Sequence, residues 1–271
     1  MTSGTKGGAA AVVPPYVPGK PLSVLDAFFS VYLGCDIGEM APGETRVVAS
    51  ARRERAELRY TEPFALWMVV AQSRCVISVR GELMRRVTRI VRPLGIERMR
   101  DPQAAQQLVI AATKTLGMGR KMTTTTGPIL YCTANTLRMW QKHDCRQVTS
   151  LDVPVVEQTG LYGPSLDRSV DEGTCFAAWS GSHPVALAGT YPVPHMADAI
   201  ADINVSGTLE GHRNQGFGRT VVSHTTRAVL NLGLVPVYMT ADSNVQSKRT
   251  ARAVGYRSYG WQFQVTLQDR D

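Results

Sequence analysis

The 271-residue sequence predicts a mixed α/β fold built around a central sheet. Runs in which apolar and polar residues alternate favour strands, and they are interleaved with segments whose apolar residues recur at helical spacing. From Cys175 onward the predicted elements follow the order β-β-β-α-β-α-β. An apolar content of 44% is that of a globular chain with an ample core.

The first half of the chain is predicted to mix helices and strands. A helix starting at Pro21 has Ser23 as its N-cap and ends at Gly34. Further helices are predicted at 83–91 and 102–116, and strands at 46–48, 65–71, 74–79 and 129–132. We also expect an exposed charged run at Arg52–Arg55, a loop at Thr123–Pro128 and a short helix at Thr136–Lys142.

A connection between two halves is predicted at residues 145–165. Val153–Val156 is expected to be extended and to cross from one half to the other, and Gly160–Ser165 has turn chemistry. The chain therefore divides into a flexible tail (1–20), an N-terminal α/β domain (21–150) and a C-terminal domain (151–271).

The second half is predicted to begin with a hairpin, formed by strands at 175–180 and 185–191 around a turn. The elements that follow are a strand from Asp202, a helix from about Arg219, a strand at 235–240, a helix at 244–254 and a strand at 261–267. This half also contains the segment whose residue types point most directly to a binding site.

The segment Asp202–Arg219 combines a strand, a polar turn and the start of a helix. The first turn of a helix leaves backbone N–H groups without partners, and the helix dipole adds partial positive charge there. Gly216 and Gly218 let the backbone approach a ligand closely, and Arg213 and Arg219 add full positive charge. The combination predicts a cradle for a phosphate or pyrophosphate.

Two motifs in this half resemble those of the GNAT N-acyltransferases. Arg213, Gly216 and Gly218 fill the acyl-CoA pyrophosphate loop, in which Arg or Gln precedes a closely spaced pair of small residues. The last motif block of that family is matched by Asn244, Ser247, Ala251, Gly255 and Tyr256. The resemblance covers about residues 175–265 and implies a central, mixed and largely antiparallel sheet flanked by helices. A degenerate second copy in the first half would make the arrangement a tandem one.

The resemblance also implies where an acyl-CoA co-substrate binds. The strand that would pair with the pantetheine arm includes Val205, Gly207 and Thr208. The pyrophosphate would be held by the backbone of Arg213, Asn214, Gln215, Gly216, Phe217, Gly218 and Arg219. Asn244 and Ser247 match positions that face the pantetheine and the leaving thiol. The co-substrate implied is acetyl-CoA or another acyl-CoA.

Direct acyl transfer to an amine can use a base and an acid. Asp202 or Glu210 could be the base. The alternatives are that Asp202 is a solvated residue at a strand start and that Glu210 is an ordinary loop carboxylate. Many relatives carry a Tyr four residues before the final Gly to protonate the leaving thiolate, and Ala251 stands there. The alternatives are unassisted departure, a donor other than acyl-CoA, or help from Ser247, Tyr238, Tyr256 or Tyr259.

The predicted function is transfer of an acetyl group from acetyl-CoA to an amine of a small molecule. A net charge of +8 and an arginine-rich first half leave open aminoacyl-tRNA as the donor on the same fold. A third alternative is a non-catalytic module that binds nucleic acid or another ligand. The sequence leaves the acceptor and the oligomeric state open.

Composition argues against several other classes of protein. The chain has no run of about 18 apolar residues, which argues against a membrane span, and no apolar signal-peptide core. Its five cysteines are odd in number and widely spaced, which favours reduced thiols over a disulfide framework. No metal-ligand spacing occurs among them. We therefore expect a cytoplasmic enzyme that needs no metal.

Overall fold

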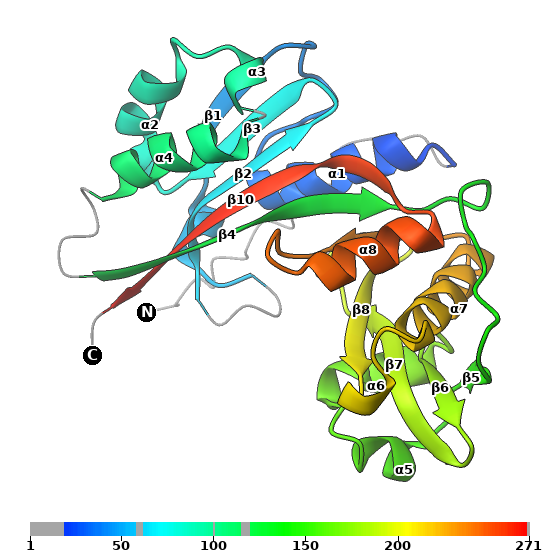
Figure 1. Cartoon of the computed structure of the whole chain (residues 1–271). Helices are drawn as coiled ribbons and strands as arrows, with labels where there is room; N and C mark the ends of the chain where they lie inside the picture. The colour runs from blue at the N-terminus through cyan, green and yellow to red at the C-terminus, as the bar shows by residue number, and fades with distance from the viewer. Residues whose placement is uncertain (1–18, 58–61, 100, 115–119, 270–271) are drawn as a thin grey trace, which may run out of the picture.

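The computed structural model describes residues 19–57, 62–99, 101–114 and 120–269, so most of the predicted tail lies outside the described residues. One sheet runs through both halves of the chain, in the strand order β1-β3-β2-β10-β4-β9-β8-β7-β6-β5 (Figure 1). Its strands are β1 (Thr45–Ala49), β2 (Phe64–Ala71), β3 (Arg74–Val79), β4 (Arg120–Tyr131), β5 (Cys145–Gln147), β6 (Phe176–Ser180), β7 (His183–Tyr191), β8 (Ile200–Thr208), β9 (Val235–Met239) and β10 (Arg257–Asp269). The helices are α1 (Pro21–Leu33), α2 (Met84–Val91), α3 (Ile96–Met99), α4 (Pro102–Thr113), α5 (Val153–Glu157), α6 (Asp167–Asp171), α7 (Phe217–Asn231) and α8 (Val245–Val254).

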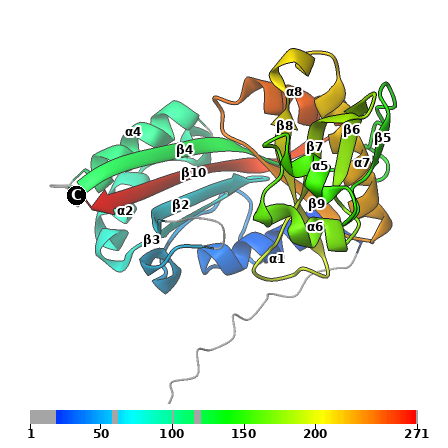
Figure 2. The ribbon, with the colours of Figure 1, turned by 90° about the horizontal axis from the view of Figure 1, so that it is seen from below.

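Helices cover both faces of the part of the sheet formed by β2, β3 and β10. Trp67 and Val69 of β2 point to the face that α1 covers. Leu66 and Met68 alternate with them along the strand and pack with α2, α3 and α4 on the other face. Figure 2 shows α1 and α4 on opposite sides of the sheet. Because β2 is buried on both faces, its continuous apolar run is explained.

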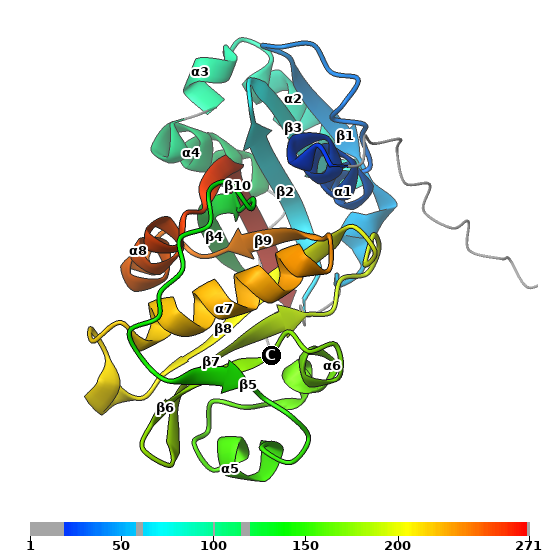
Figure 3. The same cartoon turned by 90° about the vertical axis from the view of Figure 1, so that its right-hand side faces the viewer.

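The same two faces continue into the second half. Helix α7 lies across β7, β8 and β9 (Figure 3) and packs against small residues such as Ala186 and Ala188. Leu187, between these two alanines, points to the opposite face, where it packs with residues of the α5 and α6 region. The alanines allow α7 to approach the sheet closely.

The two halves of the chain exchange strands at the centre of the sheet. Strand β4, from the first half, lies between β9 and β10 of the second. Strand β10 in turn pairs with β2 from the first half. The predicted N-terminal (21–150) and C-terminal (151–271) domains therefore contribute to one continuous sheet.

Strands β8 and β9 are parallel and separate after a short paired stretch. In the described part of the chain they pair only from Ile200 to Asp202, opposite Val235 to Val237. Beyond Asp202, β8 continues along β7 as far as Thr208, while β9 pairs with β4. We call the resulting opening between the two strands the β8–β9 fork.

The predicted mixed and largely antiparallel sheet is confirmed. The pairs β1–β3 and β8–β9 are parallel, and the other pairings of the described strands are antiparallel. The helices that flank it complete the α/β class that the sequence predicts. A second copy of the fold in the first half stays a prediction.

Four local predictions were wrong. Thr123–Pro128 belong to β4, because this run lies in register with β10 instead of forming a loop. Val153–Val156 lie in helix α5, where Pro154 is tolerated because a first-turn residue needs no N–H. Thr136–Lys142 do not form a helix, and the N–H of Arg138 donates to the Val254 carbonyl. The N-cap of α1 is Lys20 and not Ser23.

The charged run Arg52–Arg55 was predicted to be exposed, but Arg53 is fully buried. Its Nη2 donates to the Tyr32 carbonyl at 2.8 Å and to Glu57 Oε1 at 2.7 Å. The guanidinium also lies 5.5 Å from the centre of the Trp67 ring. Burial lowers the pKa of Arg53 to about 10, so the side chain stays protonated at neutral pH. This buried ion pair fixes the start of the β1–β2 connection against α1.

Gly127 of β4 occupies a position with no room for a side chain, because a Cβ atom there would overlap the carbonyl oxygen of Thr240. We expect Gly127→Ala to lower the free energy of unfolding by about 2–4 kcal/mol, since backbone would have to shift. Gly163→Ala is the matched control, because nothing lies within 4 Å of its Cβ position. Its change should stay within about 0.5 kcal/mol in denaturant unfolding. Equal stabilities of the two variants would contradict the placement of β4.

Candidate functional site

The turn between β8 and α7 contains two residues in the left-handed region. Helix α7 begins at Phe217, preceded by Gly216 with φ of 102°. Asn214 has φ of 61°. A Cβ atom on Gly218 would lie 3.3 Å from Thr208 Oγ1, so this glycine lets the first turn of α7 approach the end of β8. We call residues 210–219 the α7 turn.

Positive charge is held at both ends of the α7 turn. The Nε of Arg213 donates to the Thr208 carbonyl at 3.3 Å. The guanidinium of Arg219 lies 4.7 Å from the centre of the Trp140 ring. Between them, the first backbone N–H groups of α7 have no partner within the helix. The arrangement is therefore suited to an anion at the start of α7.

Two basic residues that the sequence analysis missed also reach the α7 turn. Lys142 Nζ lies 3.3 Å and His143 Nε2 lies 2.9 Å from the carbonyl oxygen of Gln215. The His143 ring stacks on Phe217 with 3.6 Å between the ring centres. Both residues come from the irregular segment before β5, which has no phosphate-binding pattern. Their only signal in the sequence was a basic pair close to Trp140.

The predicted pantetheine-facing positions lie at the end of β8. Gly207 has φ of 140° and pairs with Leu187, so β8 bends close to its end. Thr208 is the last residue of the strand. The backbone of Val205 pairs with that of Ala188.

Asp202 lies where β8 and β9 separate. It is the last residue of β8 that pairs with β9, and only 4% of its surface is exposed. The alternative that Asp202 is a solvated residue at a strand start is therefore wrong. The pKa of Tyr256 is raised well above its usual value, mainly by burial and in part by the charge of Asp202.

A second polar group lies beside the fork on α8 and β9. The hydroxyls of Tyr238 and Ser247 are 2.7 Å apart. Asn244 caps α8, and its Oδ1 accepts from the N–H of Ser247 at 3.0 Å. Burial raises the pKa of Tyr238 to about 12, so the phenol keeps its proton at neutral pH.

The other two tyrosines considered as acids have different partners. The hydroxyl of Tyr256 lies 2.8 Å from Thr226 Oγ1, inside the packing between α7 and α8. Tyr259 donates to Asp26 Oδ1 at 2.7 Å, beneath α1. Tyr238 is therefore the one of the three that is joined to Ser247.

The three predicted catalytic residues fall in different places, with Asp202 at the fork, Ser247 beside Tyr238 and Glu210 in the α7 turn. Val237, opposite Asp202, packs beneath α1, whereas the next residue, Tyr238, packs with α7 and α8. Asp202 and Tyr238 therefore approach the fork from opposite faces of the sheet. Glu210 is exposed in the short 3₁₀ helix Glu210–His212 of the α7 turn, away from both.

No group of three or more His, Cys, Asp and Glu side chains that could hold a metal ion occurs among the described residues. None of the helices in the described part of the chain is long and apolar enough to cross a bilayer.

Comparison with known proteins places this site within a family. Residues 139–256 match the model of the acetyltransferase (GNAT) family. A search of curated proteins found no match.

Solved structures give more distant likenesses. A GNAT-family acetyltransferase from Novosphingobium aromaticivorans is 15% identical with a TM-score of 0.46, over 57% of this chain and 69% of that one. A GNAT-family acetyltransferase from Colwellia psychrerythraea is 14% identical with a TM-score of 0.44, over 55% and 57% of the two chains. A GCN5-related N-acetyltransferase from Kribbella flavida is 19% identical with a TM-score of 0.44, over 60% and 64%. These likenesses are too distant to carry the assignment, which rests on the family match.

The matched range contains the α7 turn, the β8–β9 fork and the capped start of α8. The α7 turn holds the motif residues Arg213, Gly216 and Gly218, and the start of α8 holds Asn244 and Ser247 of the last motif block. Residues 139–256 therefore form a domain of the GNAT acetyltransferase family, a family of acyltransferase enzymes.

Proposed function

We propose that this protein transfers an acetyl group from acetyl-CoA to an amine of a small molecule. The observation that supports this most directly is the α7 turn. There the first backbone amides of α7, which have no partner within the helix, lie beside the side chains of Arg213 and Lys142. Such an arrangement suits the diphosphate of CoA.

The β8–β9 fork suits the rest of the donor. Beyond Asp202, β8 pairs with β7 along one edge, and its other edge has no β9 partner in the described part of the chain. Backbone groups on that edge can pair with the amides of the pantetheine arm, as an added strand would. The thioester then lies in the fork, between Asp202 and the pair formed by Tyr238 and Ser247.

The two polar groups at the fork take opposite roles in this proposal. Asp202 accepts the proton of the incoming ammonium, directly or through water, so that a neutral amine attacks the thioester carbonyl. The protonated Tyr238 hydroxyl, joined to Ser247, donates to the departing thiolate sulfur. Tyr238 thereby replaces the tyrosine that relatives carry at the position of Ala251.

A second candidate keeps the fold and changes the donor to aminoacyl-tRNA. The observation that favours it is a row of exposed arginines on α2, namely Arg85, Arg86 and Arg89, whose other side buries Val87 and Val91. Together with the net charge of +8, this surface could contact a polyanion. The donor assay below separates the two candidates.

Acetyl-CoA should raise the melting temperature of the protein, because a ligand that binds the native state stabilises it. Gly216→Glu should abolish this shift and lower affinity by at least about 100-fold, since the carboxylate repels the diphosphate and a non-glycine residue is strained at φ of 102°. Gly211→Ala, which has nothing within 4 Å of its Cβ position, is the control and should bind normally. Calorimetry measures both affinities.

Two outcomes would contradict this donor assignment. One is unchanged acetyl-CoA binding by the folded Gly216→Glu variant. The other is acyl transfer from aminoacyl-tRNA but not from acetyl-CoA, with tRNA binding that weakens steeply as salt is added.

Asp202→Asn should lower kcat/KM at neutral pH by about 100-fold, because the amide cannot accept a proton. The ascending limb of the pH–rate profile should disappear as well. Glu210→Gln discriminates between the two predicted bases, since Glu210 is exposed and lies outside the fork. If the limb survives in Asp202→Asn and vanishes in Glu210→Gln, the base is Glu210.

Tyr238→Phe should lower kcat by about 10- to 100-fold and leave acetyl-CoA affinity nearly unchanged, because the hydroxyl acts on the leaving thiolate. The loss should shrink with a thioester whose thiol is more acidic, since that thiolate departs without a proton. Steady-state kinetics with the two donors gives both ratios. An equal loss with both donors would remove Tyr238 from the acid role.

A further inference from the structure

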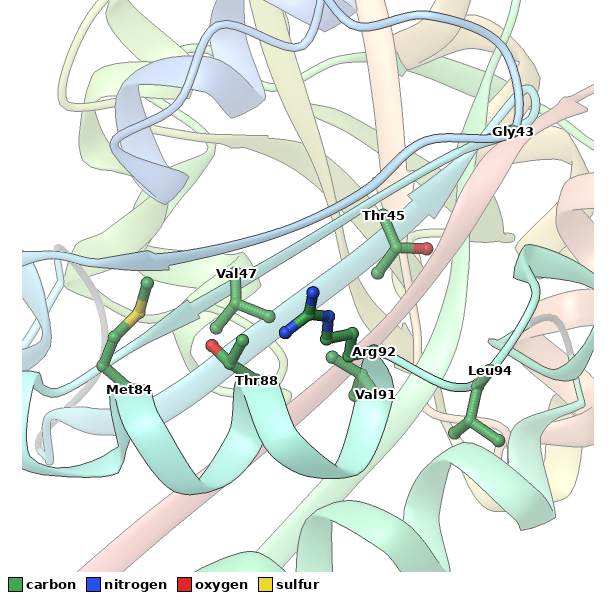
Figure 4. A pocket seen from close by; sticks show the side chains of 8 residues that line it. All are labelled: Gly43, Thr45, Val47, Met84, Thr88, Val91, Arg92 and Leu94. Carbon is green, nitrogen blue, oxygen red and sulfur yellow. The ribbon is translucent and has the colours of Figure 1, made fainter.

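A cavity of about 430 Å³ lies between β1 and α2, in the part of the chain that precedes the GNAT domain. Its lining includes Thr45 and Val47 from β1 and Thr88, Val91 and Arg92 from α2 and its end (Figure 4). This volume is within the range of pockets that take small ligands, roughly 300–1,000 Å³. No residue of the α7 turn or the β8–β9 fork lines it.

The position of α2 explains the cavity. Strand β1 lies at one edge of the sheet, and Thr45 and Val47 are two residues apart, on one side of the strand. Helix α2 buries Val87 and Val91 against the sheet. Thr88 and Arg92, one turn apart, rise from the helix into the space beside β1 (Figure 4).

Two threonines of the lining carry hydroxyl groups that are buried without a partner. The Oγ1 atoms of Thr45 and Thr88 are both enclosed and make no hydrogen bond to the protein. A helical threonine often bonds the carbonyl four residues earlier, but Thr88 does not. A buried polar atom without a partner is destabilising, so both hydroxyls are suited to a ligand that supplies acceptors.

Arg92 contributes a positive charge to the lining of the cavity. Among the described residues it forms no ion pair with a carboxylate. A guanidinium offers a planar pair of donors that matches a carboxylate. Val47, Met84 and Val91 form the apolar part of the lining. The cavity thus combines donors for an oxyanion with a surface for an apolar chain.

We propose that this cavity binds a small organic anion, a carboxylate carried on a short apolar chain. Arg92 and the hydroxyls of Thr45 and Thr88 hold the carboxylate, and Val47, Met84 and Val91 contact the chain. This site is independent of the acyl-transfer site and of the function proposed for it.

The test uses hexanoate as the probe and NMR titration of the full chain as the readout. Amide signals of Thr45, Thr88 and Arg92 should shift with saturation. Hexanol, which lacks the charge, and acetate, which lacks the chain, should each bind at least about tenfold more weakly.

Variants locate the binding. Arg92→Gln should weaken hexanoate binding by about tenfold or more, and Thr88→Val should weaken it severalfold. Arg89→Gln is the matched control, because Arg89 is exposed on the same helix and does not line the cavity. Acetyl-CoA binding by the Arg92→Gln variant should be unchanged, which also shows that it is folded.

Three results would overturn the proposal. They are shifts that do not saturate, shifts confined to other residues, and equal weakening by Arg89→Gln and Arg92→Gln. The last would show that hexanoate responds to the general charge of α2 and not to this cavity.

Discussion

The separation of β8 from β9 is the constraint on which the site depends. The two parallel strands pair over Ile200–Asp202 and then diverge, so in the described part of the chain β8 has no strand partner on one edge beyond Asp202. Helix α7 begins at the end of that edge, and Gly218 allows the two to approach closely. In the proposed complex, a diphosphate at the helix start and an extended arm along β8 would form one continuous path. Asp202 and Tyr238 would flank this path, because they lie where the two strands separate.

The first half of the chain holds the fork open. Residues 129–131 of β4 pair with β9 as far as Met239, so β9 is drawn toward the centre of the sheet and away from β8. Strand β10 then fixes β4 on its other edge and continues the sheet to β2. Helix α1 adds to this support through Asp26, which accepts from Tyr259 of β10 at 2.7 Å. The N-terminal part is thus part of the scaffold of the GNAT domain as well as the carrier of a separate cavity.

Local features of the site could be predicted from the sequence, whereas features that depend on distant contacts could not. The local backbone geometry at the start of α7 requires Gly216 and Gly218, and the start of α8 requires a cap such as Asn244. Each requirement produces a short motif in the sequence. The strand predicted at 129–132 is only the end of β4, because the threonines before it become a strand only when β10 lies beside them. Lys142 and His143 reach the α7 turn through tertiary packing from a segment without periodicity. Arg53 was predicted to be exposed because the residues around it are charged. Its burial depends on hydrogen bonds to Glu57 and to the Tyr32 carbonyl, which a local pattern does not reveal.

The central claim is that main-chain amides at the start of α7 bind the diphosphate of an acyl-CoA. A crystal structure of the complex with CoA tests it most directly. We expect the diphosphate oxygens within hydrogen-bonding distance of the backbone nitrogens of residues 216–219, and the pantetheine amides paired with β8 beyond Asp202. A complex in which CoA binds elsewhere, with the α7 turn and the β8–β9 fork both vacant, would contradict the account.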